Sequence, residues 1–247
     1  MEKQMHLAAQ YLAAAGISFL EKESDDSHTN LGFNIENGCL CTHTLSDKGD
    51  QLCLNYETFS LEWKSNKGIT TFELDGAMHA EVLNWLEDTS KAHLNKTYNY
   101  EFHYDLPYAI NHSFTFELLD SDQLDALKNL RVLAQLALEK IDRIYGLDAS
   151  IRVWPHHFDT GIYSALPNSD ITIGLGLAIP DTISNKHYLY ISGYKNGGKI
   201  EPSQLPKLEF GEWKSGDFIG AILKADTIVE SEGVAFFEAA ITQLKNS

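Results

Sequence analysis

Two imidazoles and a carboxylate fall within four consecutive positions of one segment, Trp154-Pro155-His156-His157-Phe158-Asp159. Neutral imidazole and carboxylate groups ligate zinc, iron or manganese, so His156, His157 and Asp159 form a candidate metal set. In an alternative interpretation, His157 and Asp159 are a catalytic acid–base pair in which the carboxylate orients the imidazole. In a third, the same groups form a hydrogen-bonded polar cluster that only stabilises the sheet.

The strand expected over residues 150–165 would decide which of these side chains share a face. Alternate residues of a strand point to opposite faces. One continuous strand therefore places His157, Asp159 and Tyr163 together on a polar face, with His156 on the core face. Pro155 cannot donate a ladder hydrogen bond, so a bulge or a strand start at this residue would re-aim both imidazoles.

Aromatic residues downstream could complete a ligand site. Tyr188 and Tyr190 alternate with apolar residues, which leaves a tyrosine stripe on one face of a strand. Together with Trp154 these tyrosines are candidate ligand-binding residues. Asp181, which follows a proline at a strand end, is a fourth candidate, although it could equally belong to a turn.

The elements that must position these residues occur in blocks. Helices are expected over residues 2–15, where Gly16 would end the helix, and over 77–93, 121–145 and 229–245. Strands are expected at residues 31–36, 39–45, 52–57, 59–64, 69–74, 150–165, 170–179, 187–194 and 217–224. Two further strands, broken near Pro107, are expected within residues 97–118. Blocks of strands predict an α+β fold with a mostly antiparallel sheet and packed helices.

A short repeated sequence suggests how the chain is organised. Glu62-Trp63-Lys64-Ser65 recurs as Glu212-Trp213-Lys214-Ser215, and each copy is followed by a strand and an apolar helix. This pattern is consistent with two related halves, residues 1–118 and 119–247. No long linker separates them, so we expect residues 1–247 to pack as a single compact unit.

Three cysteines are too few for a disulfide scaffold and favour a reducing compartment. Cys39 and Cys41 share a strand face but lie roughly 6–7 Å apart, which is too wide to chelate one ion easily. If Lys48-Gly49 forms the hairpin turn, Cys53 lies opposite Thr44 and points to the other face. We therefore expect buried structural thiols and a cytoplasmic protein.

The net charge of −16 excludes several partners. Nucleic acids and anionic membrane surfaces both require a basic patch, and the sequence contains none. Cationic or neutral small molecules, or metal ions, suit this charge better. No segment reaches the length of a membrane-spanning helix. The sequence also lacks a P-loop, an HExxH helix and a GxSxG elbow, which disfavours nucleotide hydrolysis, zincin proteolysis and α/β-hydrolase chemistry.

The second half resembles a group of uncharacterised bacterial proteins that carry the WPHHFD string. The resemblance rests on that string, on Gly174-x-Gly176-x-Ala178-Ile179-Pro180-Asp181 and on Tyr188-x-Tyr190-x-Ser192-Gly193. Over residues 125–245 the chain is also similar to a catalogued bacterial domain of unknown function. The resemblance implies that residues 154–159 and the Tyr188–Tyr190 strand belong to one functional surface. It implies no activity.

Two functions follow from these observations. In the first, the chain is a small-molecule-binding protein or enzyme in which His157 is a base or ligand, Asp159 orients or co-ligates, and His156 is a second ligand. Trp154 and the tyrosines would form the pocket wall. In the second, the chain is a non-catalytic acidic interaction module and the His/Asp cluster is structural. The sequence does not indicate an oligomeric state.

Overall fold

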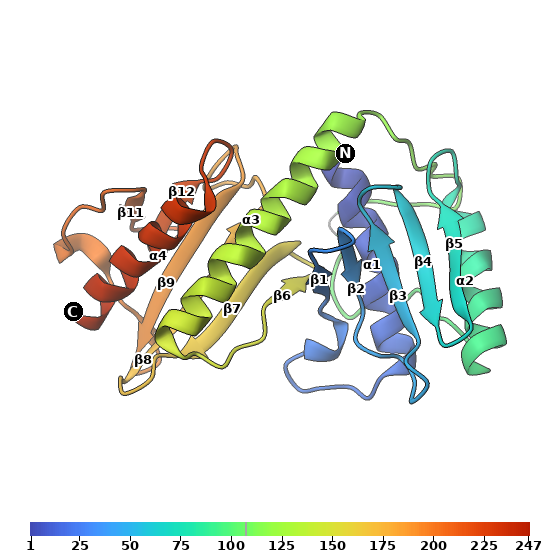
Figure 1. The fold of residues 1–247 in the computed structure, drawn as a ribbon, viewed down its shortest axis with the longest axis horizontal. Helices are drawn as coiled ribbons and strands as arrows, with labels where there is room; N and C mark the ends of the chain where they lie inside the picture. The colour runs from blue at the N-terminus through green and yellow to red at the C-terminus, as the bar shows by residue number, and fades with distance from the viewer. Residues whose placement is uncertain (107) are drawn as a thin grey trace. The chain divides into compact units, whose positions relative to one another are not determined.

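The computed structural model describes residues 1–106 and 108–247 and is an α+β fold with antiparallel sheets. The chain divides into two compact units, described separately below (Figure 1). Unit 1 comprises Met1–Lys128 and Val153–His157, and unit 2 comprises Asn129–Arg152 and Phe158–Ser247. Within the described residues, no helix is both long and apolar enough to cross a membrane.

Unit 1 contains a five-stranded antiparallel meander in the order β1-β2-β3-β4-β5. Its strands are β1 (Gly32–Asn34), β2 (Cys39–Cys41), β3 (Gln51–Asn55), β4 (Ser60–Ser65) and β5 (Gly68–Glu73). Its helices are α1 (Glu2–Phe19), the short 3₁₀ helix η1 (Ser27–Thr29) and α2 (His79–Leu94), and α3 (Ser121–Tyr145) begins in this unit.

One face of the unit 1 sheet forms the core. Trp63 on β4 is fully buried, and its ring meets Phe19 of α1 at 6.3 Å between centroids. Phe72 on β5 meets Trp85 of α2 at 5.4 Å. In the β4–β5 register, Trp63 and Phe72 point to the same face of the sheet. Helices α1 and α2 therefore pack on the same side of the sheet.

Helix α1 continues past the residue expected to end it. A Cβ atom at position 16 would lie 2.5 Å from the His28 carbonyl oxygen, so Gly16 allows the following chain to cross close to the helix. The helix then extends to Phe19, where the Leu20 amide closes on the Gly16 carbonyl at 3.0 Å. The glycine therefore serves a close approach and not a helix end.

The structure corrects the cysteine prediction. Cys41 and Cys53 are directly opposite in the β2–β3 register and form a disulfide, whereas Cys39 is a buried free thiol. The expected register was wrong because the chain reverses through a longer loop, in which the Gly49 amide bonds Ser46 O at 3.0 Å and the Leu45 amide bonds Asp50 O at 2.7 Å.

Unit 2 contains antiparallel strands in the order β11-β12-β9-β8-β7, with the short β10 paired with β9. The strands are β7 (Asp159–Ala165), β8 (Ile171–Ala178), β9 (Tyr188–Lys195), β10 (Gly198–Lys199), β11 (Glu212–Lys214) and β12 (Gly220–Lys224). Most of α3 lies here, with the 3₁₀ helix η2 (Pro202–Gln204) and α4 (Glu230–Lys245). The short strand β6 (Arg152–Trp154) crosses the boundary between the units.

Helices α3 and α4 lie along the same face of this sheet (Figure 1). The buried residues of α3 recur at helical spacing and form one stripe with the sheet residues Leu175 and Ile191. The α3 members of this stripe are Ala134, Ala137, Leu138 and Ile141. The opposite face of the sheet therefore carries the alternate residues of each strand.

Several expectations for the elements were confirmed and others were wrong. Helix α3 spans the expected residues 121–145, and α2 and α4 lie within about two residues of theirs. Described residues between 97 and 118 form no strand, and the break expected near Pro107 lies outside the described residues. Both copies of the Glu-Trp-Lys-Ser string lie on strands, β4 and β11, but β4 is interior and β11 is an edge strand. The relation between two halves, and the packing of residues 1–247 as a single compact unit, stay predictions.

Candidate functional site

The WPHHFD segment is a strand end, a turn and a strand start. β6 ends at Trp154, residues 155–158 form a turn, and β7 begins at Asp159. The His157 amide donates to the Trp154 carbonyl at 3.2 Å, and Phe158 has a positive φ of 57°. A continuous strand over 150–165 was therefore the wrong expectation, and the alternation of faces assumed for His156, His157 and Asp159 does not apply.

Within unit 1 this turn is attached to helix α1 through a backbone carbonyl. The Pro155 oxygen accepts a hydrogen bond from Gln10 Nε2 at 2.8 Å and lies 2.8 Å from His6 Nε2. The Tyr104 hydroxyl donates to Gln10 Oε1 at 2.8 Å and so orients that amide. Both helical side chains are buried, so a buried polar cluster fixes the position of the turn.

The two predicted imidazoles lie on the outer side of this turn. His156 and His157 are exposed, and their ring centroids are 4.2 Å apart. The half-buried Trp154 ring lies 6.2 Å from that of His156. The structure thus brings together Trp154, His156 and His157 within unit 1, as neighbouring aromatic rings on a tight turn.

Within unit 2 the predicted tyrosines pair with the predicted carboxylates. The Tyr190 hydroxyl donates to Asp159 Oδ2 at 2.7 Å, and the Tyr188 hydroxyl donates to Asp181 Oδ2 at 2.8 Å. Burial raises the pKa of Tyr190 well above its usual value, and the negative charge of Asp159 adds to this effect. Burial likewise raises the pKa of Tyr188, assisted by its bond to Asp181. Both phenols therefore act as neutral hydrogen-bond donors.

Glycines make room for the tyrosines on the sheet face opposite α3 and α4. Gly161, Gly176 and Tyr190 are aligned across β7, β8 and β9. A Cβ atom at position 161 would lie 2.8 Å from the Tyr190 hydroxyl. The rings of Tyr163 and Tyr194 lie against Gly174 in the same way, at 3.4 and 3.7 Å from the Cβ position. The Gly-x-Gly spacing is visible in the sequence, but its relation to the tyrosines depends on the strand register.

We call this surface the tyrosine face and define it by Tyr163, Tyr190, Tyr194 and Asp159. The Tyr163 side chain is 69% exposed, and its ring meets Tyr194 edge to face at 5.6 Å. Strand alternation places all four residues on the side of the sheet away from the apolar stripe of α3. The exposed Tyr163 ring, the half-buried Tyr194 ring and the Tyr190–Asp159 pair therefore share one face of the sheet.

Arg131 supports the start of β7 from the other face of the sheet. The residue is buried, with only 4% of its surface exposed. Its guanidinium donates to Thr160 Oγ1 at 2.6 Å and to the Phe158 carbonyl at 2.5 Å, and it lies 4.3 Å from the centre of the Phe158 ring. A buried cation thus holds the two residues on either side of Asp159 in place.

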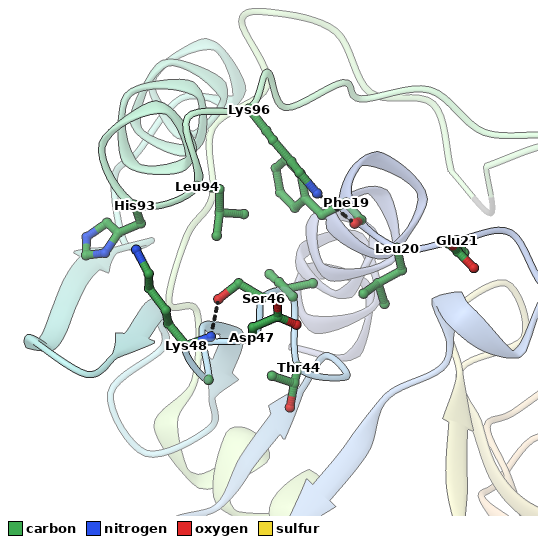
Figure 2. Close-up of a pocket in the computed structure, with 12 residues that line it drawn as sticks. Phe19, Leu20, Glu21, Thr44, Ser46, Asp47, Lys48, His93, Leu94 and Lys96 are labelled. Atoms are coloured by element: carbon green, nitrogen blue, oxygen red, sulfur yellow. Dashed lines mark hydrogen bonds between the residues drawn. The ribbon is translucent and has the colours of Figure 1, made fainter.

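A pocket of about 750 Å³ in unit 1 was missed by sequence reasoning (Figure 2). It lies between the end of α1, the loop of residues 44–49 and the end of α2. Its lining residues are Phe19, Leu20, Glu21, Thr44, Leu45, Ser46, Asp47, Lys48, Gly49, His93, Leu94 and Lys96. The sequence gives no local signal for this pocket because its walls come from three separate segments.

A buried carboxylate organises the wall of this pocket. Asp50 is 2% exposed and accepts hydrogen bonds from the Trp63 indole at 3.0 Å and from Ser46 Oγ at 2.5 Å. Its Oδ1 also lies 3.6 Å from His93 Nδ1. Asp50 therefore fixes a loop residue and an α2 residue that both line the pocket.

Similarity to known proteins does not identify the function of these features. Comparison with family models, with curated proteins and with solved structures finds no match to this chain. Among residues 1–106 and 108–247, no group of three His, Cys, Asp or Glu side chains is arranged to hold a metal ion. Metal binding by His156, His157 and Asp159 stays a prediction.

Proposed function

We propose that this chain is a small-molecule-binding protein or enzyme whose ligand contacts the tyrosine face of unit 2. The observation that carries the proposal is the Tyr190–Asp159 pair, which lies on the same sheet face as the exposed Tyr163 ring. We interpret Gly161 and Gly174 as the means of holding these aromatic rings close to the sheet.

The class of ligand that fits best is an organic cation. Tyrosine rings attract ammonium groups through their electron-rich faces. Asp159 adds a carboxylate to the same face, and the whole chain carries a net charge of −16. Both the local chemistry and the long-range field therefore favour a positively charged ligand.

The hydrogen bond between Tyr190 and Asp159 also supports an alternative. Because these groups satisfy each other, they could form the structural cluster of a non-catalytic interaction module. The two functions differ in what a binding experiment would find. A ligand site recognises a small cation in isolation, whereas a structural cluster does not.

Titration calorimetry with choline and with its uncharged isostere 3,3-dimethylbutan-1-ol tests the proposal. We expect choline to bind and the isostere to bind at least about fivefold more weakly, because the isostere lacks the cation–π term. Asp159→Asn should weaken choline binding by a similar factor. Asp148→Asn, an exposed carboxylate change elsewhere in unit 2, should have no effect. Equal binding of the two probes, or no binding of either, would rule out the cation site.

The predicted roles of the WPHHFD histidines belong to the same proposal. His157 would act as a base or metal ligand and His156 as a second ligand, with zinc, iron or manganese as the candidate ions. Elemental mass spectrometry of the tag-free protein beside a His156→Ala/His157→Ala double variant tests this. Near-stoichiometric metal that disappears in the variant supports a metalloprotein, whereas equal metal in both samples contradicts it.

The setting of the protein is also a proposal. We infer membership of the bacterial group carrying the WPHHFD string, a cytoplasmic location, and no nucleic-acid or membrane partner. The absence of a membrane-spanning helix in the described residues is compatible with this location. The Cys41–Cys53 disulfide argues against a reducing compartment. Counting the free thiols of protein that is acid-trapped and alkylated directly from cells would distinguish a reducing from an oxidising compartment.

A further inference from the structure

We propose that the pocket of unit 1 binds a small organic anion with an apolar body and a single carboxylate. This site is independent of the tyrosine face and recognises the opposite charge. It consists of an apolar floor, basic groups at the rim and a buried carboxylate that fixes the wall.

The apolar part of the pocket comes from three segments. Phe19 and Leu20 belong to the end of α1, Leu45 to the β2–β3 loop and Leu94 to the end of α2. In Figure 2 the side chain of Leu94 points into the space between the helix ends and the loop. A pocket of about 750 Å³ with such a floor can cover an aromatic ring or a short alkyl chain.

Basic side chains border this floor. Figure 2 shows Lys48 rising from the loop on the side of His93, and Lys96 approaching from the other side. Lys96 Nζ donates to the Phe19 carbonyl at 3.3 Å, which uses one of its three N–H groups and leaves two for a ligand. Within the described residues, no ion pair is formed by the exposed Lys48 ammonium.

Two acidic residues, Glu21 and Asp47, also line the pocket. In Figure 2 Glu21 points away from the other lining residues, whereas the exposed Asp47 lies beside Ser46 on the loop that carries Lys48. Asp50 lies behind the wall, where it bonds Trp63 and Ser46 and faces His93. In a chain with 35 acidic and 19 basic side chains, a lining with two lysines and two carboxylates is less acidic than the chain as a whole. An anion in this pocket would meet the Lys48 and Lys96 ammonium groups at the rim.

The test uses benzoate as the probe and benzamide as its uncharged match. Benzoate is titrated into the full chain, labelled with ¹⁵N, and followed by amide chemical shifts. We expect shifts at residues 44–49 and 93–96, and a Kd for benzamide at least about fivefold higher than that for benzoate. Lys48→Gln should raise the Kd for benzoate by a similar factor. Lys67→Gln, in the exposed β4–β5 turn, is the matched control and should leave the Kd unchanged.

Each other outcome overturns the proposal. Absence of benzoate shifts at these residues would show that the pocket does not bind the anion. Equal Kd values for benzoate and benzamide would show that charge is not recognised. Equal effects of Lys48→Gln and Lys67→Gln would indicate general screening of the protein surface and not a site. Because both lysines are exposed, neither variant should disturb the fold.

Discussion

The hydroxyl of Tyr190 on β9 reaches the carboxylate of Asp159 on β7, although β8 lies between the two strands. The Tyr190 hydroxyl can lie over β7 because Gly161 carries no Cβ atom, which would come within 2.8 Å of that hydroxyl. One hydrogen bond of 2.7 Å therefore ties two strands that are not neighbours.

This pair predicts a loss of stability at alkaline pH. Burial and Asp159 raise the pKa of Tyr190 above its ordinary value of 10.0. Above that pH the unfolded chain releases the phenolic proton while the folded chain retains it, so the free energy of unfolding falls as pH rises. The slope is about 1.4 kcal/mol per pH unit for each such tyrosine. Urea titrations between pH 8 and 11 should show a shallower fall for Tyr190→Phe, and identical slopes would contradict the pairing.

Unit 1 should lose stability in acid through a different residue. Burial, with a smaller contribution from His112, lowers the pKa of His79 from 6.5 to about 4, and Tyr11 lies 2.7 Å from its Nδ1. The unfolded state binds a proton first, so stability is complete above pH 6.5 and is lost as pH falls to about 4. The loss should be on the order of 2–3 kcal/mol. His79→Asn should remove this part of the pH dependence in urea unfolding, and an unchanged acid slope would refute it.

Replacing the buried guanidinium of unit 2 should be costly. Arg131→Met leaves the Phe158 carbonyl and the Thr160 hydroxyl without their donors, and we expect a loss of about 2–4 kcal/mol in unfolding free energy. Lys140→Met on the same helix alters an exposed pair and should cost less than about 0.5 kcal/mol. If both variants unfold at the same urea concentration, the guanidinium bonds do not stabilise the protein.

The Cys41–Cys53 disulfide should stabilise the β2–β3 hairpin. A closed loop of this size contributes about 2–4 kcal/mol, chiefly by restricting the unfolded chain. Dithiothreitol should therefore lower the melting temperature of the wild-type protein but not that of Cys41→Ser/Cys53→Ser. Alkylation of all three cysteines in protein never exposed to a reductant would contradict the disulfide.

His157→Ala should leave the fold intact. The side chain is exposed, and the turn is held instead by the Pro155 carbonyl, so the change in unfolding free energy should stay within about 0.5 kcal/mol. His6→Ala, which removes a buried neighbour of that carbonyl, is the contrasting variant and should cost more than 1 kcal/mol, roughly the worth of one buried hydrogen bond. A loss of several kcal/mol in His157→Ala would mean that the imidazole is structural.

Sequence periodicity predicted the elements that depend on local pattern. The apolar spacing predicted α3 over residues 121–145, and Gly146, just beyond the helix end, adopts a positive φ of 62°. The same reasoning failed where an alternating pattern has no partner strand. Tyr98 and Tyr104 alternate with polar residues as in a strand, yet the structure bonds their hydroxyls to Tyr11 and Gln10 of helix α1.

The candidate sites show a similar division. Strand alternation pointed to Tyr188 and Tyr190 as polar-face residues, and the structure places both hydroxyls on carboxylates. Asp50 and His93 carry no signal in the sequence, since their proximity depends on how a loop and a helix end fold together. The Cys41–Cys53 pairing was missed because it depends on the length of one hairpin loop.

The short segment Val153–His157 makes unit 1 discontinuous along the chain. It belongs to unit 1 but is encoded after the part of α3 that belongs to unit 2. Within unit 1 it exchanges two backbone hydrogen bonds between Val153 and Leu31 and supplies the Pro155 oxygen to Gln10. A recombination event or a truncation at residue 128 would therefore deliver unit 1 without its last piece.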